Sequence, residues 1–228
     1  MAKARKKRYE SPLREAQARS TRMLVLEAAR KLFTEQGYVA TSVDEIARSA
    51  GVGRATVFAS VGGKPALLKQ AYDVALVGDD EPVPLVERPR SQAIRADPDP
   101  RSYLARYAGM VTEIAGRLAG IYEAVRQASG ADSVARDLWR EILRQRRAGM
   151  DNLIRDVATK GALREGLDAK SAADVAWILV DPGLYQMLVQ QRGWPPAQYQ
   201  AWLTDLLQSQ LLPPRSGGRR PKRPTRAG

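Results

Sequence analysis

The chain has 228 residues, enough for one large or two small domains, and carries a formal net charge of +12 with neither cysteine nor histidine. The missing residue types exclude disulfides, thiolate nucleophiles and the sulfur and imidazole ligands of most metal sites, so we expect no metal and no cofactor. No run of about 18 apolar residues and no secretory signal is present, so we expect no membrane segment and a cytoplasmic protein. No acid–base dyad or phosphate-binding loop stands out, so an enzyme is not expected.

Most of the positive charge lies at the two ends of the chain. Residues 1–8 carry +5 and residues 213–228 carry +6, which leaves +1 for residues 9–212. Basic ends attract polyanions without reading sequence, because each neutralised phosphate releases counterions. Two interpretations stay open: contact with nucleic acid, or solvated ends. We treat residues 1–19 as a flexible basic arm and residues 213–228 as a disordered basic tail.

Short helices with clear boundaries are predicted in the first third of the chain. Apolar residues recur at helical spacing from about 20 to 36, and Gly37 is expected to end this helix. A second helix over 43–50 begins at a predicted capping box, in which Ser42 caps free amides and Glu45 reaches back.

The turn Gly51-Val52-Gly53 separates this helix from a third one over 54–60, and Lys64-Pro65 opens a fourth to about 76. Two short helices around a tight turn indicate a helix-turn-helix unit, whose second helix enters the major groove. The outward side chains of that helix are therefore expected to read DNA. These side chains belong to Arg54, Ala55, Thr56, Phe58, Ala59 and Ser60.

Phosphate contacts are expected on both sides of the reading helix. Amides at helix N-termini near Ser42 and Gly53 suit phosphate oxygens, and Thr41 beside them is included in the predicted DNA-binding set. Lys64, at the start of the next helix, is placed for a phosphate on the far side.

The rest of the chain is predicted to be a helical domain behind a connection. Residues 77–100 are rich in proline and charge, with one helical turn near 91–95. The fold class is thus all-α, with an N-terminal DNA-binding domain of three to four helices at 20–76 and a C-terminal helical domain at 101–212. We predict C-terminal helices near 100–128, 132–160, 169–192 (kinked at Pro182-Gly183) and 195–211. The arginines of 136–147 are interpreted as a solvated face.

Residues 26–68, LEAARKLFTEQGYVATSVDEIARSAGVGRATVFASVGGKPALL, resemble the DNA-binding domain of TetR/AcrR-type transcriptional regulators. The resemblance is specific over about 20–76, weaker in the last two predicted helices, and limited to helical character over about 78–170. It implies a homodimer, a palindromic operator in double-stranded DNA, and a C-terminal domain in which a small ligand alters the dimer geometry. The positions that carry it include Phe33, Gly37, Tyr38, Thr41, Ser42, Val43, Ile46, Ala47, Ala50, Gly51, Val52, Thr56, Lys64 and Leu67.

One position departs from the family pattern. Phe58 stands where these regulators usually have a tyrosine that binds a phosphate through its hydroxyl. A phenylalanine can only pack, so that contact is in doubt. Base reading is then expected to depend on Arg54, on Thr56, on methyl contacts and on the basic arm in a neighbouring groove.

The resemblance places dimerisation in the last two predicted helices, which present apolar stripes. Packing within one chain is the alternative. The predicted interface residues are Val175, Ile178, Leu188, Trp202, Leu203 and Leu206.

The small-molecule ligand, of unknown identity, is expected among the helices of about 100–187, where aromatic and methionine side chains could line a pocket. Ordinary core packing is the alternative for each of them. The predicted lining residues are Tyr107, Met110, Trp139, Met150 and Trp177.

The function these features favour is a sequence-specific transcriptional regulator, a repressor whose operator binding is relieved by a ligand. It would act in the cytoplasm on the nucleoid. A nucleoid-type protein that binds DNA non-specifically through its basic ends is the main alternative. An activator or a ligand-blind regulator also stays open.

Overall fold

The computed structural model describes residues 12–214, which form helices and no strand. The all-α prediction is therefore confirmed for this part of the chain. The predicted basic arm and tail lie largely outside the described residues. None of the described helices is long and apolar enough to span a membrane.

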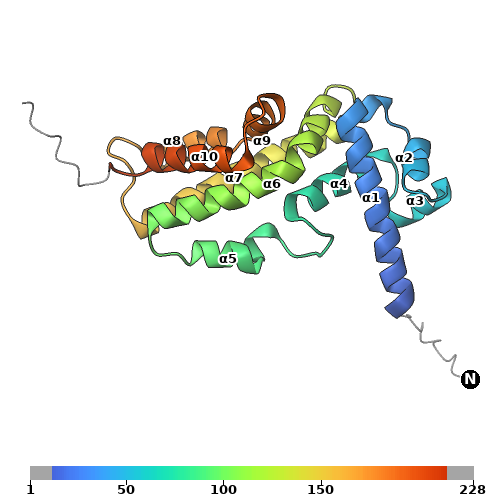
Figure 1. Cartoon of the computed structure of the whole chain (residues 1–228), viewed down its shortest axis with the longest axis horizontal. Helices are drawn as coiled ribbons and strands as arrows, with labels where there is room; N and C mark the ends of the chain where they lie inside the picture. The colour runs from blue at the N-terminus through green and yellow to red at the C-terminus, as the bar shows by residue number, and fades with distance from the viewer. Residues whose placement is uncertain (1–11, 215–228) are drawn as a thin grey trace, which may run out of the picture.

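The N-terminal helices follow the predicted order. They are α1 (Pro12–Ala40), α2 (Val43–Ser49), α3 (Arg54–Ser60) and α4 (Lys64–Val77). Gly37 interrupts the helical path of α1 with a φ of 81°, a conformation that favours glycine, so the predicted stop falls inside a helix that resumes for one short turn. The start of α1 extends beyond the body of the molecule, and its side chains from Leu13 to Ser20 are exposed (Figure 1).

A connection with two short helices leads into the C-terminal helices. It contains η1 (Leu85–Glu87, a 3₁₀ turn) and α5 (Pro89–Arg95), which begins earlier than the predicted turn. The long helices α6 (Pro100–Ala128) and α7 (Ser133–Lys160) follow, each with an aspartate N-cap. The chain ends in α8 (Ala169–Leu179), α9 (Pro182–Tyr185), the π-helical turn η2 (Gln186–Gln191) and α10 (Pro196–Leu211).

The segment 169–192 is not the single kinked helix that the sequence predicts. It is broken after Leu179, because Asp181 leaves the helical path and caps α9 by accepting a hydrogen bond from Gly183 N at 2.8 Å. Pro182 then occupies the first turn of α9, where its missing N–H is harmless.

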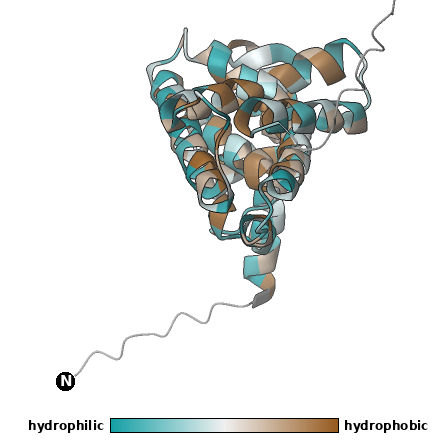
Figure 2. Cartoon of the chain, turned by 90° about the vertical axis from the view of Figure 1, so that its left-hand side faces the viewer, coloured by the Kyte–Doolittle hydropathy of each residue, from teal (hydrophilic) through white to brown (hydrophobic). Residues whose placement is uncertain are grey.

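Two apolar cores meet along α6. Its C-terminal half packs with α1 and α4 in one core, and its N-terminal half packs with α7, α8 and α10 in the other. Figure 1 shows α2 and α3 at one end of the long axis, and α8 and α10 toward the other. Hydrophobic and hydrophilic segments alternate along the helices, as expected when each helix buries one face (Figure 2). The end that contains α2 and α3 and the far end are therefore joined by one continuous helix.

Candidate nucleic-acid interface

A small apolar cluster sets the angle between α2 and α3. Ile46 and Ala47 of α2 and Val57 of α3 are buried in the core shared with α1. Val52 N donates to Ala47 O at 3.0 Å to close the turn, and Gly51 takes a left-handed φ of 68°. One face of α3 is thereby fixed inward, and the opposite face is left to solvent.

The predicted capping box at the start of α2 is confirmed. Ser42 Oγ accepts a hydrogen bond from Glu45 N at 3.2 Å, and the Glu45 carboxylate accepts one from Ser42 N at 2.7 Å. The backbone bond from Ser42 is the main cause that lowers the pKa of Glu45. The carboxylate thus already occupies the Ser42 amide, and a phosphate that approaches this helix end meets a negative charge.

The outward face of α3 contains the residues that the sequence assigns to DNA reading. Phe58 is 46% exposed, an unusual position for a large apolar ring. Ser60 Oγ donates to Val57 O at 3.2 Å and so contributes less to the surface. The exposed members of this face are Arg54, Ala55, Thr56, Phe58 and Ala59, and Ser60 is half-buried.

Arg54 is held in place before any ligand arrives. Its guanidinium lies 2.6 Å from an Asp44 carboxylate oxygen and 5.5 Å from the centre of the Phe58 ring. Both ion-pair partners are more than half exposed, so the contact orients Arg54 and adds little stability. Phe58 therefore serves as a platform for an arginine at the start of the reading helix.

Two of the predicted DNA-binding residues, Thr41 and Lys64, have partners within the chain. Thr41 is 1% exposed, and its hydroxyl donates to Gly37 O at 2.8 Å. The prediction that its side chain contacts DNA is therefore corrected: the hydroxyl stabilises the C-terminal end of α1. Lys64 is half-buried over the Tyr38 ring, 4.4 Å from its centre, and donates to Val39 O at 3.2 Å. Burial lowers the pKa of Lys64. Its ammonium still has free donors beside the interface.

A groove of about 750 Å³ runs between the start of α1 and α3. Thr56, Ala59 and Ser60 of α3 line one side, and Arg14 and Arg22 line the other. Arg14 belongs to the predicted flexible arm of 1–19, but α1 already begins at Pro12, so the prediction is wrong for residues 12–19; Arg22 lies in the predicted helix and was not assigned to DNA. The signal was their spacing, which places Arg14, Arg19 and Arg22 near one face of a helix. The groove gives the reading face a positively charged flank.

Two of the predicted ligand-pocket residues surround a buried ion pair. Trp139 packs on Tyr122 with ring centres 4.9 Å apart, and the Trp177 ring lies 4.9 Å from the Arg146 guanidinium. Arg146 is 13% exposed and lies 2.8 Å from Asp181. The interpretation of the arginines of 136–147 as a solvated face is therefore wrong for Arg146, because it pairs between α7 and the α8–α9 break.

The other three pocket candidates lie elsewhere. Met150 is 5% exposed in the C-terminal core, and Tyr107 lies beside Tyr103 with ring centres 6.4 Å apart. Met110 lines a pocket between α4, the connection and α6. The five candidates are thus spread over several places, and Met110 is the one that borders this pocket.

The predicted dimer residues divide into outward and inward positions. Ile178 on α8 is 58% exposed, and the half-buried members are Val175, Leu188, Trp202 and Leu206. Leu203 is completely buried in the core of its own chain. The prediction that Leu203 contacts a second subunit is corrected, because this side chain faces the core of its own chain. Trp202 and Leu206, on the neighbouring part of the apolar surface of α10, remain half-buried.

Residues 25–71 match the family model described as bacterial regulatory proteins, tetR family. Comparison with curated proteins gives no match. Among solved structures, the chain is similar to FadR from Bacillus subtilis in complex with stearoyl-CoA, with 21% identity over 81% of this chain and 96% of that chain, and a TM-score of 0.64.

Two further structures show the same fold. One is the fatty acid degradation regulator FadR from Bacillus halodurans, with 17% identity, 87% of this chain and 95% of that chain covered, and a TM-score of 0.63. The other is NalD from Pseudomonas aeruginosa, the secondary repressor of the MexAB-OprM multidrug efflux pump, with 20% identity, 88% and 100% covered, and a TM-score of 0.61. The likeness therefore extends well beyond residues 25–71 into the C-terminal helices.

Proposed function

By its N-terminal domain the chain belongs to the tetR family of bacterial regulatory proteins, and we propose that it is a transcriptional repressor that binds its operator through α3. The observation that carries this proposal is the exposed face of α3. Arg54 and Thr56 project from a helix whose opposite side is fixed by Val57. Such a helix fits the major groove, where base edges can be distinguished.

We assign the contacts by chemistry. Arg54 is suited to a guanine edge, and the Thr56 methyl, Ala55 and Ala59 are suited to thymine methyl groups. The Gly53 amide and the Lys64 ammonium bind phosphates beside α3. Arg14 and Arg22 bind the phosphates of the strand that follows the groove between α1 and α3. Phe58 contributes by holding Arg54.

The repressor acts as a two-fold dimer through α8 and α10. The support is the apolar surface around Ile178, together with Met187, which is 48% exposed on η2. An Ile178→Asp variant is expected to shift the chain from dimer to monomer in analytical ultracentrifugation, because it places a charge in the apolar contact. Val134→Asp is the matched control: Val134 is 56% exposed on α7, outside this face. Equal effects of both variants, or none, would contradict this interface.

A small effector lowers the affinity for the operator. The support is the fold shared with a regulator that was solved with stearoyl-CoA. A ligand can shift the protein only by binding one arrangement of the domains more tightly than the other. Such a regulator works in the cytoplasm, on the nucleoid.

Non-specific binding through the basic ends is the rival function, and the charges of +5 and +6 at the ends favour it. Selection of genomic fragments at about 150 mM salt separates the two, because tail-driven binding is weakened there. The full chain is compared with a full-length variant in which the arginines and lysines of 1–8 and 215–226 are glutamines. Recovery of one palindrome by both supports the proposal. Loss of all DNA by the variant, with no shared motif for the wild type, refutes it.

A further inference from the structure

A pocket of about 460 Å³ lies where the end of α4 meets the connection and α6. This volume is within the range of small-ligand sites. Its walls combine two kinds of side chain. The apolar ones belong to Val77, Leu85, Pro89, Met110 and Ile114, and the charged ones to Asp79, Arg88, Arg90, Glu113 and Arg117.

The charges of this junction pocket do not cancel. Arg88 forms a two-bond ion pair with Asp79 at 2.5 and 2.7 Å, and Arg90 forms one with Glu113. Arg117 is exposed at the rim of the pocket, donates from Nε to Ala75 O at 3.2 Å and forms no ion pair of its own among the described residues, although its charge helps Arg90 to lower the pKa of Glu113. One positive charge is therefore left over in a pocket with apolar walls.

We propose that the junction pocket binds the effector, and that the effector is an amphipathic monoanion, a carboxylate on an apolar chain. Arg117 holds the carboxylate, because a guanidinium offers paired donors that match two oxygens. Met110, Ile114 and Leu85 cover the apolar chain. This inference rests on the proposed function, since it names the ligand class and the site of that regulation.

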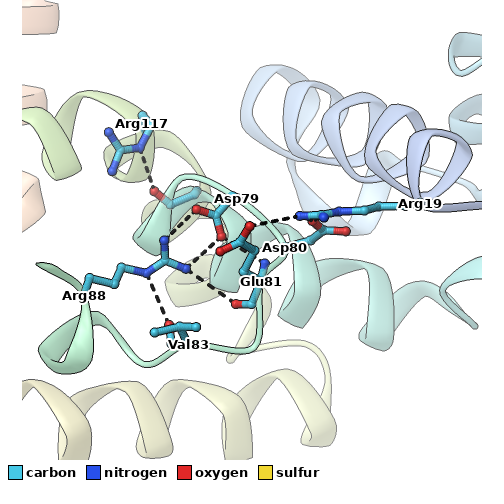
Figure 3. A network of polar contacts seen from close by, with 8 residues as sticks. Arg19, Asp79, Asp80, Glu81, Val83, Arg88 and Arg117 are labelled. Carbon is cyan, nitrogen blue, oxygen red and sulfur yellow. Dashed lines mark hydrogen bonds and ion pairs between the residues drawn. The ribbon is translucent and has the colours of Figure 1, made fainter. Parts of the chain in front are cut away.

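The acidic turn Asp79-Asp80-Glu81 lies between Arg88 of the pocket and Arg19 of α1 (Figure 3). Asp79 faces the pocket through Arg88, while the next residue, Asp80, binds the Arg19 guanidinium of α1 at 2.6 Å. Arg19 also lines the groove beside α3. The Asp80 side chain is 8% exposed, so the contact is well shielded from water.

The turn begins at Gly78, directly beside Arg117. Gly78 ends α4 with a φ of 97°, and the Arg117 guanidinium lies against it. A carboxylate that binds Arg117 side-on, through Nε and one terminal nitrogen, takes the Nε donor away from Ala75 O, the acceptor in the last turn of α4. Displacement of the turn then draws Asp80 away from Arg19, and the start of α1 loses its fixed position beside the DNA.

Binding is tested first without DNA, by calorimetry on the full chain. The probes are straight-chain carboxylates from hexanoate to dodecanoate, with primary alcohols and amines of the same lengths. We expect saturable binding of at least one carboxylate, and at least about tenfold weaker binding of the matching alcohol and amine, because a bond to a charged group is lost.

Variants locate the carboxylate. Arg117→Gln is expected to weaken its binding by about tenfold or more, and Arg117→Lys, which keeps the charge, to restore most of it. Arg140→Gln is the matched control, because Arg140 is 72% exposed on α7 and pairs only with Asp137. Absence of carboxylate binding to the wild type, or equal binding by Arg117→Gln, would overturn the assignment.

The connection to DNA is tested on the selected operator. The carboxylate is expected to weaken operator binding by the wild type, whereas Asp80→Asn should bind the carboxylate and show at most a small effect on DNA affinity. A full response in Asp80→Asn overturns the route through Arg19. Failure of the wild type to bind any operator would instead refute the proposed function, and the calorimetry would still report on the pocket.

Discussion

At one end of the molecule, the start of the seven-residue helix α2 is set by contacts between near neighbours, those of Ser42 with Glu45, and the apolar side chains of α2 and α3 pack on α1. At the other end, α8 and α9 are separated at Asp181, whose partner Arg146 comes from a different helix. The first kind of contact forms wherever the local sequence is intact. The second depends on how long helices are placed relative to one another. The start of α2 is therefore specified by its own residues, whereas the break between α8 and α9 depends on a partner in α7.

The largest effect on stability is expected when the long-range contact between Arg146 and Asp181 is removed. Arg146→Met removes the bonds to Asp181 at 2.8 Å, to Tyr122 Oη at 2.6 Å and to Trp177 O at 3.1 Å. We expect a loss of about 2–3 kcal/mol in urea unfolding, below the ~3–5 kcal/mol of a fully buried pair because Asp181 is 30% exposed.

Two further variants check that the Arg146 effect belongs to the pair. Arg140→Met is the control and should change stability by less than about 0.5 kcal/mol, since its ion pair is at the surface. Asp181→Asn added to Arg146→Met should recover part of the loss. A similar loss of stability in Arg146→Met and Arg140→Met would mean that the Arg146–Asp181 pair stabilises the fold no more than a surface ion pair does.

The next effect concerns the joint between the two ends. Gly120 of α6 lies so close to α1 that a Cβ there would be 2.4 Å from Thr34 Cγ2. Gly120→Ala is expected to cost about 1–2 kcal/mol, because overpacking outweighs the better helix propensity of alanine. In the double variant with Thr34→Ala the clash is removed, and the stability should return to that of the wild type or exceed it. Strict additivity in this double-mutant cycle would contradict the close packing.

A smaller effect sharpens the description of the DNA-binding end. Ser42→Ala removes the capping box of α2 and should lower the free energy of unfolding by about 1 kcal/mol. Ser49, exposed at the other end of the same helix, provides the control Ser49→Ala, which is expected to be nearly neutral. If the two serines behave alike in thermal unfolding, the cap does not set the start of α2.

The smallest effect is electrostatic and depends on pH. Arg88 lowers the pKa of Asp79 to about 2 from an ordinary value of 3.8. The carboxylate therefore stabilises the fold fully above about pH 4, and this contribution is lost as the pH falls through 2. With 39% of the Asp79 side chain exposed, we expect less than about 1 kcal/mol. The wild type should lose more stability than Asp79→Asn between pH 5 and pH 2.5, and parallel curves would contradict the pairing.

The same contrast explains what could be predicted from the sequence. The capping box of Ser42, the left-handed Gly37 and the turn at Gly51-Val52-Gly53 follow from residue type and spacing within a few positions, and the structure contains them. The break at Asp181 could not be predicted in this way, because it depends on a partner in α7. The local sequence predicts only a kink at Pro182-Gly183.

The local sequence also does not predict which side of each C-terminal helix is buried. The apolar stripe of α10 was visible, but which side faces its own core was not, and Leu203 was misassigned for this reason. The junction pocket requires α4, the connection and α6 to meet, so its charges at Asp79, Arg88 and Arg117 had no common sequence signal.

The most direct test of the central claim is the specificity that α3 provides. Binding of the selected operator and of a scrambled duplex of equal length is measured for the wild type and for Arg54→Ala with Thr56→Ala, at about 150 mM salt. We predict that the wild type prefers the operator by about a thousandfold or more, and that the double variant loses about 1–3 kcal/mol per base contact on the operator alone. Equal losses on both duplexes, or no preference by the wild type, would show that α3 does not read the sequence.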